Sequence, residues 1–242
     1  MNESALDGDD DYEESKPNLS PQIQPKTKKL FILNQNEIVL AELFRRPYSK
    51  QFLGFCLQRF EVGVWSSARG YNIDGALKCA MGNHKEKLLF VWVGLIPMVN
   101  AEKPLYMKEL QKVWNLYDSI YSRSNTLMID DKPYRALYNP AHLSIFTKSY
   151  DINDEEDNLF DPNGELCKYL EGVYKAEDVP RHIQHNPFGL PPITPSHPDW
   201  KYYKKVQNIG PSASVLWSFL GHSAEVIVTR STHAYCYISS CA

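Results

Sequence analysis

The run Leu30-Phe31-Ile32-Leu33 is followed directly by Asn34-Gln35-Asn36, so four apolar residues give way at once to three carboxamides. An apolar run without alternation is typical of a strand that is buried on both faces of a parallel sheet. Ligands of such sheets bind beyond the carboxyl ends of the strands. The sequence therefore predicts that Asn34 and Asn36 lie where a ligand would bind.

Similar runs follow along the chain, separated by segments with helical spacing. Further strands are predicted at 62–65, 88–93, 126–129 and 144–146, with helices beginning at Arg46-Pro47 and spanning 70–83 and 108–117. This alternation predicts an α/β fold with a central, mostly parallel sheet and helices on both faces. Polar residues that end the later strands should share one edge with Asn34, and they are Ser66, Asp130 and Asp131.

Composition excludes several classes of protein. Lys and Arg total 26 against 29 Asp and Glu, a formal charge of −3 that argues against a general nucleic-acid binder. Hydrophobic residues make up 43% of the chain, which is enough for a globular core. The five cysteines form no C-x-x-C pair, so reduced thiols are expected and neither a disulfide framework nor a zinc site is.

Three regions are expected along the chain. Residues 1–26 are acidic and then proline-containing, and they predict a disordered arm that is neither a secretory signal nor a transit peptide. Residues 27–205 form the predicted domain, and 206–242 are a tail of uncertain order with two β-like runs. No run reaches the length of a membrane span. The protein is expected to be a monomer in the nucleus or cytoplasm, with a mitochondrial location as the alternative.

Several motifs, in a fixed order, resemble the haloacid-dehalogenase (HAD) superfamily. The resemblance is closer to the phosphatase domain of the RNA polymerase II C-terminal-domain phosphatases, the NIF (NLI-interacting factor) family. It covers roughly residues 26–205 and rests on Lys28 to Leu33, Arg46-Pro47-Tyr48, Phe60 to Ser67, Lys108-Glu109-Leu110, Thr126 to Pro133 and Asn186 to Gly189. The fold that this implies is a HAD-like three-layer sandwich with a short insertion near the carboxyl edge of its sheet.

In that family the first strand ends in Asp-x-Asp, where one Asp attacks phosphorus and the other is the general acid and base. The resemblance places Asn34 at the nucleophile position and Asn36 at the acid/base position. A carboxamide is a poor nucleophile and has no titratable proton to give. Ser66 and Lys108 match the groups that bind the phosphoryl oxygens. Asp130 and Asp131, with Asn34 and Asn36, would hold Mg²⁺ weakly or not at all.

The resemblance thus implies a pseudophosphatase that retains binding to a phosphorylated Ser/Thr segment or to another protein. One alternative is a non-enzymatic scaffold or receptor, because the presequence receptor of the mitochondrial inner-membrane translocase has the same type of domain. Another is an active phosphatase. Taken singly, the two asparagines are ordinary turn residues, Lys108 is a solvated lysine and the acidic pair is a helix cap. The order of the motifs favours a site over these readings.

Overall fold

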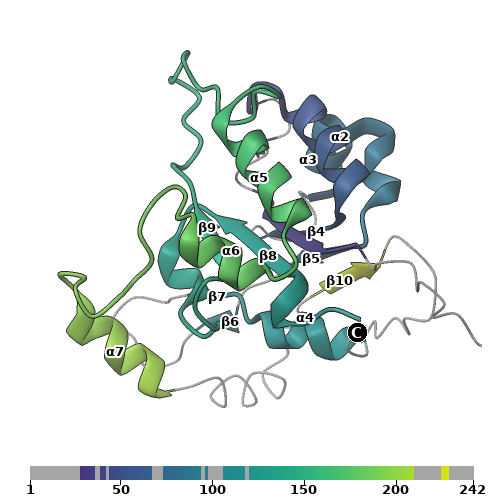
Figure 1. The fold of residues 1–242 in the computed structure, drawn as a ribbon. Helices are drawn as coiled ribbons and strands as arrows, with labels where there is room; N and C mark the ends of the chain where they lie inside the picture. The colour runs from purple at the N-terminus through teal and green to yellow at the C-terminus, as the bar shows by residue number, and fades with distance from the viewer. Residues whose placement is uncertain are drawn as a thin grey trace, which may run out of the picture.

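The computed structural model describes residues 28–35, 39–41, 44–66, 73–93, 96–97, 106–117, 120–209 and 225–228. A six-stranded sheet in the order β10-β5-β4-β1-β8-β9 lies at its centre (Figure 1). Five neighbouring strands are parallel, and β10 pairs antiparallel with β5. The strands are β1 (Leu30–Asn34), β4 (Glu61–Ser66), β5 (Phe90–Val93), β8 (Thr126–Asp130), β9 (Ser144–Phe146) and β10 (Glu225–Val228).

Strand β1 explains the layering, because all five of its residues are buried. Phe31 and Leu33 face one hydrophobic cluster, and Leu30 and Ile32 face another. Alternate side chains of a strand point to opposite faces, so the two clusters are the two sides of the sheet. The sheet is therefore the middle of three layers.

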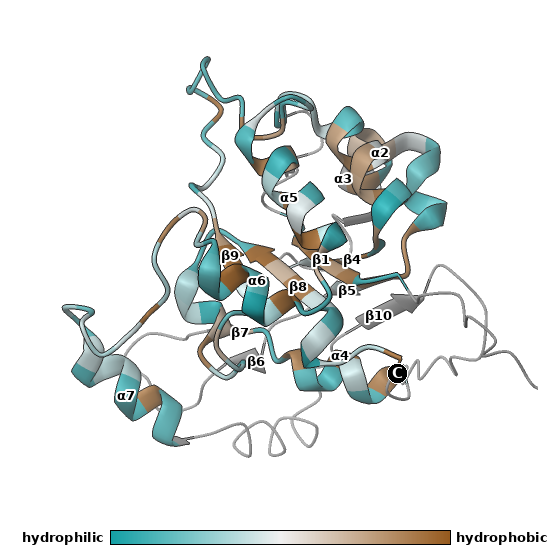
Figure 2. Ribbon diagram, viewed as in Figure 1, coloured by the Kyte–Doolittle hydropathy of each residue, from teal (hydrophilic) through white to brown (hydrophobic). Residues whose placement is uncertain are grey.

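The helices divide between these two faces (Figure 1). The cluster at Phe31 includes residues of α2 (Ser49–Arg59), α3 (Ile73–Met81), α5 (Glu165–Lys175) and α6 (Val179–His185). The cluster at Ile32 includes residues of α4 (Leu110–Leu116). Figure 2 shows hydrophobic colour along β8 and β9, while α5 mixes hydrophilic and hydrophobic residues. This contrast is expected of strands covered on both faces and of a helix that buries one side.

Short elements complete the described fold. The hairpin of β2 (Val39–Ala41) and β3 (Phe44–Arg45) follows β1, and that of β6 (Ile96–Pro97) and β7 (Tyr106–Met107) follows β5. These are insertions near the carboxyl edge. The 3₁₀ helices are η2 (Gly82–Lys87), η3 (Arg123–Asn125) and η4 (Pro133–Ala136), and α7 (Trp200–Ile209) comes late in the chain.

The predicted α/β fold is confirmed, and the strands and first helices lie close to their expected positions. The helix expected over 70–83 ends at Met81, because Gly82 adopts a φ of 52° and the chain tightens into η2. One of the two β-like runs of the tail forms β10 at the sheet edge. The arm 1–26 lies outside the described residues, and the three-region division stays a prediction. Within the described ranges no helix is both long and apolar enough to span a bilayer.

Candidate functional site

Three of the predicted site residues lie at the ends of neighbouring parallel strands. Asn34 ends β1, Ser66 ends β4 and Asp130 ends β8, with Asp131 directly after it. β1 pairs with β4 on one side and with β8 on the other, so these ends meet at one edge of the sheet. This is the edge at which parallel α/β proteins bind ligands.

The side chain of Asn34 is fully buried and points its amide nitrogen at an acid. Its Nδ2 donates a hydrogen bond of 2.9 Å to Oδ1 of Asp131. Its Oδ1 is buried and has no hydrogen-bond partner within the described ranges. An amide held in this way offers neither a nucleophilic oxygen anion nor a transferable proton.

Ser66, expected to bind a phosphoryl group, is engaged with the residue next to Asn34. Its hydroxyl donates to Oε1 of Gln35, and both side chains are buried. Gln35 was not predicted to belong to the site, although a carboxamide directly after a buried strand was a visible signal. Asn36 lies outside the described residues, so its placement at the acid/base position stays a prediction.

Lys108 is fully buried, so the interpretation as a solvated lysine is wrong. Its Nζ lies 2.6 Å from Oδ2 of Asp130 and donates to the carbonyl oxygen of Trp65 at 3.2 Å. Burial lowers the pKa of Lys108 below its ordinary value, and Asp130 offsets part of that effect. The ammonium is thus placed at the carboxyl edge, beside the ends of β4 and β8.

Arg135 is a member of the site that the sequence analysis missed. Its Nη1 lies 2.9 Å from Oδ1 of Asp130 and 3.0 Å from Oδ1 of Asp131. Burial lowers the pKa of Arg135, but the two carboxylates more than offset this and raise it. The available signal in the sequence was a cationic residue four positions after an acid. This signal is weak, because such pairs are common on protein surfaces.

Asp131 has further partners on its other oxygen. The hydroxyl of Ser149 donates to Oδ2 at 2.9 Å, and Nζ of Lys132 lies 3.3 Å away. Burial raises the pKa of Asp131, but the Ser149 hydrogen bond and Arg135 outweigh burial and lower it. The second acid of the pair is therefore held as an anion.

The donor set can be compared with what Mg²⁺ requires. This ion prefers six oxygen ligands at about 2.1 Å, usually including carboxylates and water. The unpartnered Oδ1 of Asn34 would suit a cation, but both carboxylates are already bound by buried cations. Among the described residues, no three His, Cys, Asp or Glu side chains gather as metal ligands. This donor set therefore does not fit Mg²⁺.

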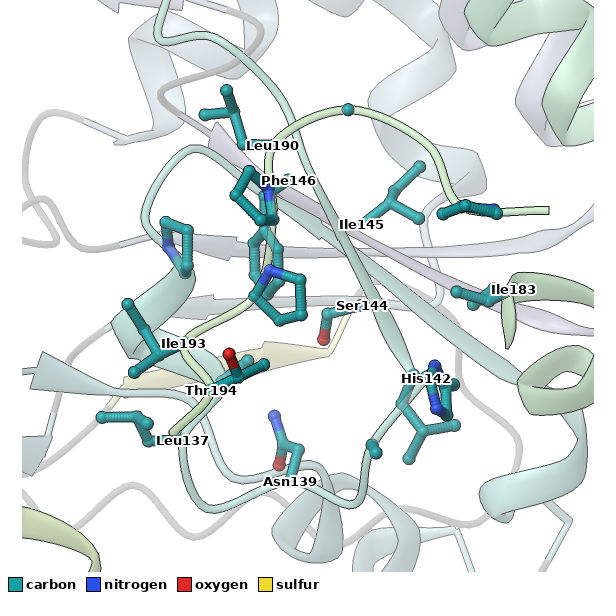
Figure 3. Close-up of a pocket in the computed structure, with 18 of the residues that line it drawn as sticks. Leu137, Asn139, His142, Ser144, Ile145, Phe146, Ile183, Leu190, Ile193 and Thr194 are labelled. Carbon is teal, nitrogen blue, oxygen red and sulfur yellow. The ribbon is translucent and has the colours of Figure 1, made fainter. Parts of the chain in front are cut away.

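A separate cavity of about 800 Å³ lies beyond the β9 edge of the sheet (Figure 3). Figure 3 shows Phe146, Ile193 and Leu137 on one side, Ile183 on the other and Ser144 between them. Its lining comes from η4, residues 137–143, β9, α6, residues 187–194 and Gln207 of α7. None of the site residues described above lines it, so it is distinct from the strand-end site.

A model of one protein family matches most of this chain. The family model described as NLI interacting factor-like phosphatase matches residues 14–180. The ubiquitin-like domain-containing CTD phosphatase 1 of Danio rerio is 26% identical over 173 residues, covering 67% of this chain and 49% of the relative. The Homo sapiens protein of the same name is 25% identical over 141 residues, which cover 55% of this chain and 43% of that protein. The chain thus spans about half the length of these relatives.

A solved structure described as Fcp1, an essential RNA polymerase II CTD phosphatase, is also similar. It aligns over 80% of this chain and 64% of its own, with a TM-score of 0.39 and 12% identity.

Proposed function

Because the chain belongs to the NLI interacting factor-like phosphatase family, we propose that it is a pseudophosphatase domain that binds a protein partner without hydrolysing phosphate. The observation that supports this most directly is the contact between Asn34 and Asp131. A carboxamide stands at the family's nucleophile position, and its nitrogen is turned toward the acid. The covalent aspartyl-phosphate step then has no attacking oxygen anion.

The expected loss of activity is large. General acid/base catalysis alone contributes a factor of about 100 to 10,000, and a missing nucleophile adds to that loss. The proposed ligand is a phosphorylated Ser/Thr segment, which the family and the names of the relatives suggest. Weak or absent dependence on Mg²⁺ is part of the same proposal, as is a nuclear or cytoplasmic location.

A phosphatase assay tests the proposal. The full chain is incubated with an aryl phosphate and with a CTD phosphoserine peptide in the presence of Mg²⁺, beside an active phosphatase of the family. The expected result is no turnover above that of an Asp130→Ala variant. Robust turnover that disappears in Asp130→Ala would show that the domain is an active enzyme.

A second candidate is a scaffold or receptor that binds an unphosphorylated segment, as the likeness to the presequence receptor suggests. It is favoured by the internal pairing of Ser66 with Gln35 and of Lys108 with Asp130. Calorimetry with a matched pair of peptides separates the two candidates. Tighter binding of the phosphoserine peptide supports phosphate recognition, whereas equal binding of both peptides supports the scaffold.

A further inference from the structure

The acidic strand end of this site contains its own counter-charges. Asp130 lies 2.6 Å from Lys108 and 2.9 Å from Arg135, and Asp131 lies 3.0 Å from Arg135. The exposed fractions of these side chains are 0% for Asp130 and Lys108, 8% for Asp131 and 9% for Arg135. Lys132 is 44% exposed, so its contribution is screened by water. Two buried anions thus face two buried cations.

All four carboxylate oxygens already accept from a donor. Asp130 accepts from the backbone N–H of Lys132 and from Arg135 on Oδ1, and from Lys108 on Oδ2. Asp131 accepts from Asn34 and Arg135 on Oδ1, and from Ser149 on Oδ2. A divalent ion would therefore have to approach carboxylates that two buried cations already neutralise.

The local backbone fixes Arg135 in this position. Pro133 begins η4, and proline is tolerated at a first helical position because an N–H there would have no partner within the helix. The N–H of Arg135 donates to the carbonyl of Lys132 at 3.0 Å. The carbonyl of Arg135 accepts from the N–H of Lys108 at 2.9 Å. The same short turn thus ties both cations together and directs the guanidinium back to the acids.

We propose that Arg135 is a built-in cation that replaces a divalent metal in neutralising Asp130 and Asp131, so that the folded domain is independent of Mg²⁺. The inference rests on the weak or absent dependence on Mg²⁺ in the proposed function and adds the residue that causes it, and it holds for either class of protein partner. A guanidinium suits this position, since it cannot lose its proton and its Nη1 contacts both carboxylates.

Thermal unfolding of the full chain tests the proposal. Tm is measured in EDTA and in millimolar MgCl₂ at matched ionic strength, together with calorimetric titration of MgCl₂. The expected result is the same Tm in both buffers and no saturable heat. A rise of Tm in MgCl₂ above the ionic-strength control would overturn the proposal, because the carboxylates would then hold the metal.

Variants test the role of the guanidinium itself. Arg135→Gln should lower Tm by about 10 °C, the shift expected when a buried ion pair loses one partner. Arg123→Gln is the matched control on an exposed side chain, and its Tm should stay near that of the parent. An Arg135→Gln variant as stable as Arg123→Gln would contradict the proposal.

Two more variants separate the charge of Arg135 from its packing. Arg135→Lys retains the charge and should retain most of the parent Tm. In a chain that already has Asp131→Asn, Arg135→Gln should lower Tm by less than in the parent, because the cation has one anion fewer to neutralise. Two results would assign Arg135 a packing role alone. One is a fall of Tm in Arg135→Lys as large as that in Arg135→Gln. The other is an equal fall of Tm for Arg135→Gln in the parent chain and in the chain with Asp131→Asn.

Discussion

We propose that Asn34 occupies the position of the family's attacking aspartate, and the two side chains differ by one charge. Its nitrogen donates to Asp131, so the side chain and the acid attract each other. An aspartate at this position would bring a second buried anion within about 3 Å of the first, and like charges at that distance resist joint ionisation.

The first prediction is that Asn34→Asp is destabilising at neutral pH. The free energy of unfolding should fall by about 2 kcal/mol, since a buried hydrogen bond becomes a contact between like charges. The substituted carboxyl should have a raised pKa, so the loss should shrink as the pH falls toward about 4. Urea unfolding between neutral pH and about pH 4 measures this change in the free energy of unfolding, with Asn34→Leu as an uncharged control. A pH-independent loss equal to that of Asn34→Leu would contradict the charge argument.

The second prediction concerns Asp131, whose pKa is lowered in the folded protein. On acidification, the Asp131 carboxylate is therefore protonated at a higher pH in the unfolded chain than in the folded protein. Asp131 contributes stability above the unfolded pKa of about 4, and that contribution is lost as the pH falls through the lower folded pKa. Asp131→Asn should thus reduce the loss of stability between about pH 5 and pH 3. Glu155→Gln, on an exposed side chain, should leave the acid profile unchanged.

At the scale of elements, residues 187–194 pass beside the end of β9 and line the cavity of Figure 3. Leu190 donates its N–H to the carbonyl of Phe146 at 2.6 Å, and this contact is an isolated bridge to the end of β9. Gly189, just before it, has a φ of 78°, and a Cβ there would lie 2.0 Å from the Phe146 oxygen. The close approach of the two backbones requires glycine at this position.

The third prediction compares two glycines with positive φ. Gly189→Ala should cost about 3 kcal/mol, because backbone strain and a clash with Phe146 act together. Gly82→Ala should cost about 1 kcal/mol, since its φ of 52° is strained but a Cβ there meets no atom within 4 Å. Urea unfolding gives both values, and limited proteolysis checks that the larger loss is local to 187–194. Equal costs would show that the close approach does not matter.

The sequence predicted those elements whose signals are local. A buried parallel strand is a short apolar run, and for that reason 30–33, 62–65 and 126–129 were found. Helix α5 went unpredicted, although the burial of Leu166, Leu170 and Val173 follows a visible helical spacing. The positions of Gln35 and Arg135 depend on how turns direct side chains across the site, which neither spacing nor composition records.

The acidic loop at 151–157 shows the same limit. Its charges predict a solvated loop, and Asp151 is exposed. Asp157, however, is buried against Arg46, with Nη2 and Oδ2 2.9 Å apart. Arg46 also lies over the ring of Phe160, 5.1 Å from its centre. Only the tertiary fold distinguishes this acid from its neighbours in the same run.

At the scale of the whole molecule, the five parallel strands are flanked at both edges. β10 pairs with β5 at one edge, and Leu190 contacts the end of β9 at the other. Exposed strand edges invite pairing with other chains, so such coverage protects a monomer. The monomeric state itself stays a prediction.

The fourth prediction is that a chain ending at residue 209 associates where a chain ending at residue 228 does not. The shorter chain lacks β10, which leaves the outer backbone groups of β5 without that partner strand. Light scattering over a range of concentrations should show oligomers of the shorter chain, and urea should unfold it more easily. Indistinguishable mass and stability of the two chains would show that β10 adds nothing to the sheet.

The strand order also has a consequence for biosynthesis. β1 is central, yet its neighbours β4 and β8 are translated after it, and β8 only at Thr126–Asp130. A nascent chain emerging from the ribosome therefore exposes the apolar segment Leu30–Leu33 until the second neighbour arrives. Asn34 can contact Asp131 only after β8 has been synthesised, so the strand-end site forms after that point. Chaperones that bind apolar segments could act on β1 between its own synthesis and that of β8.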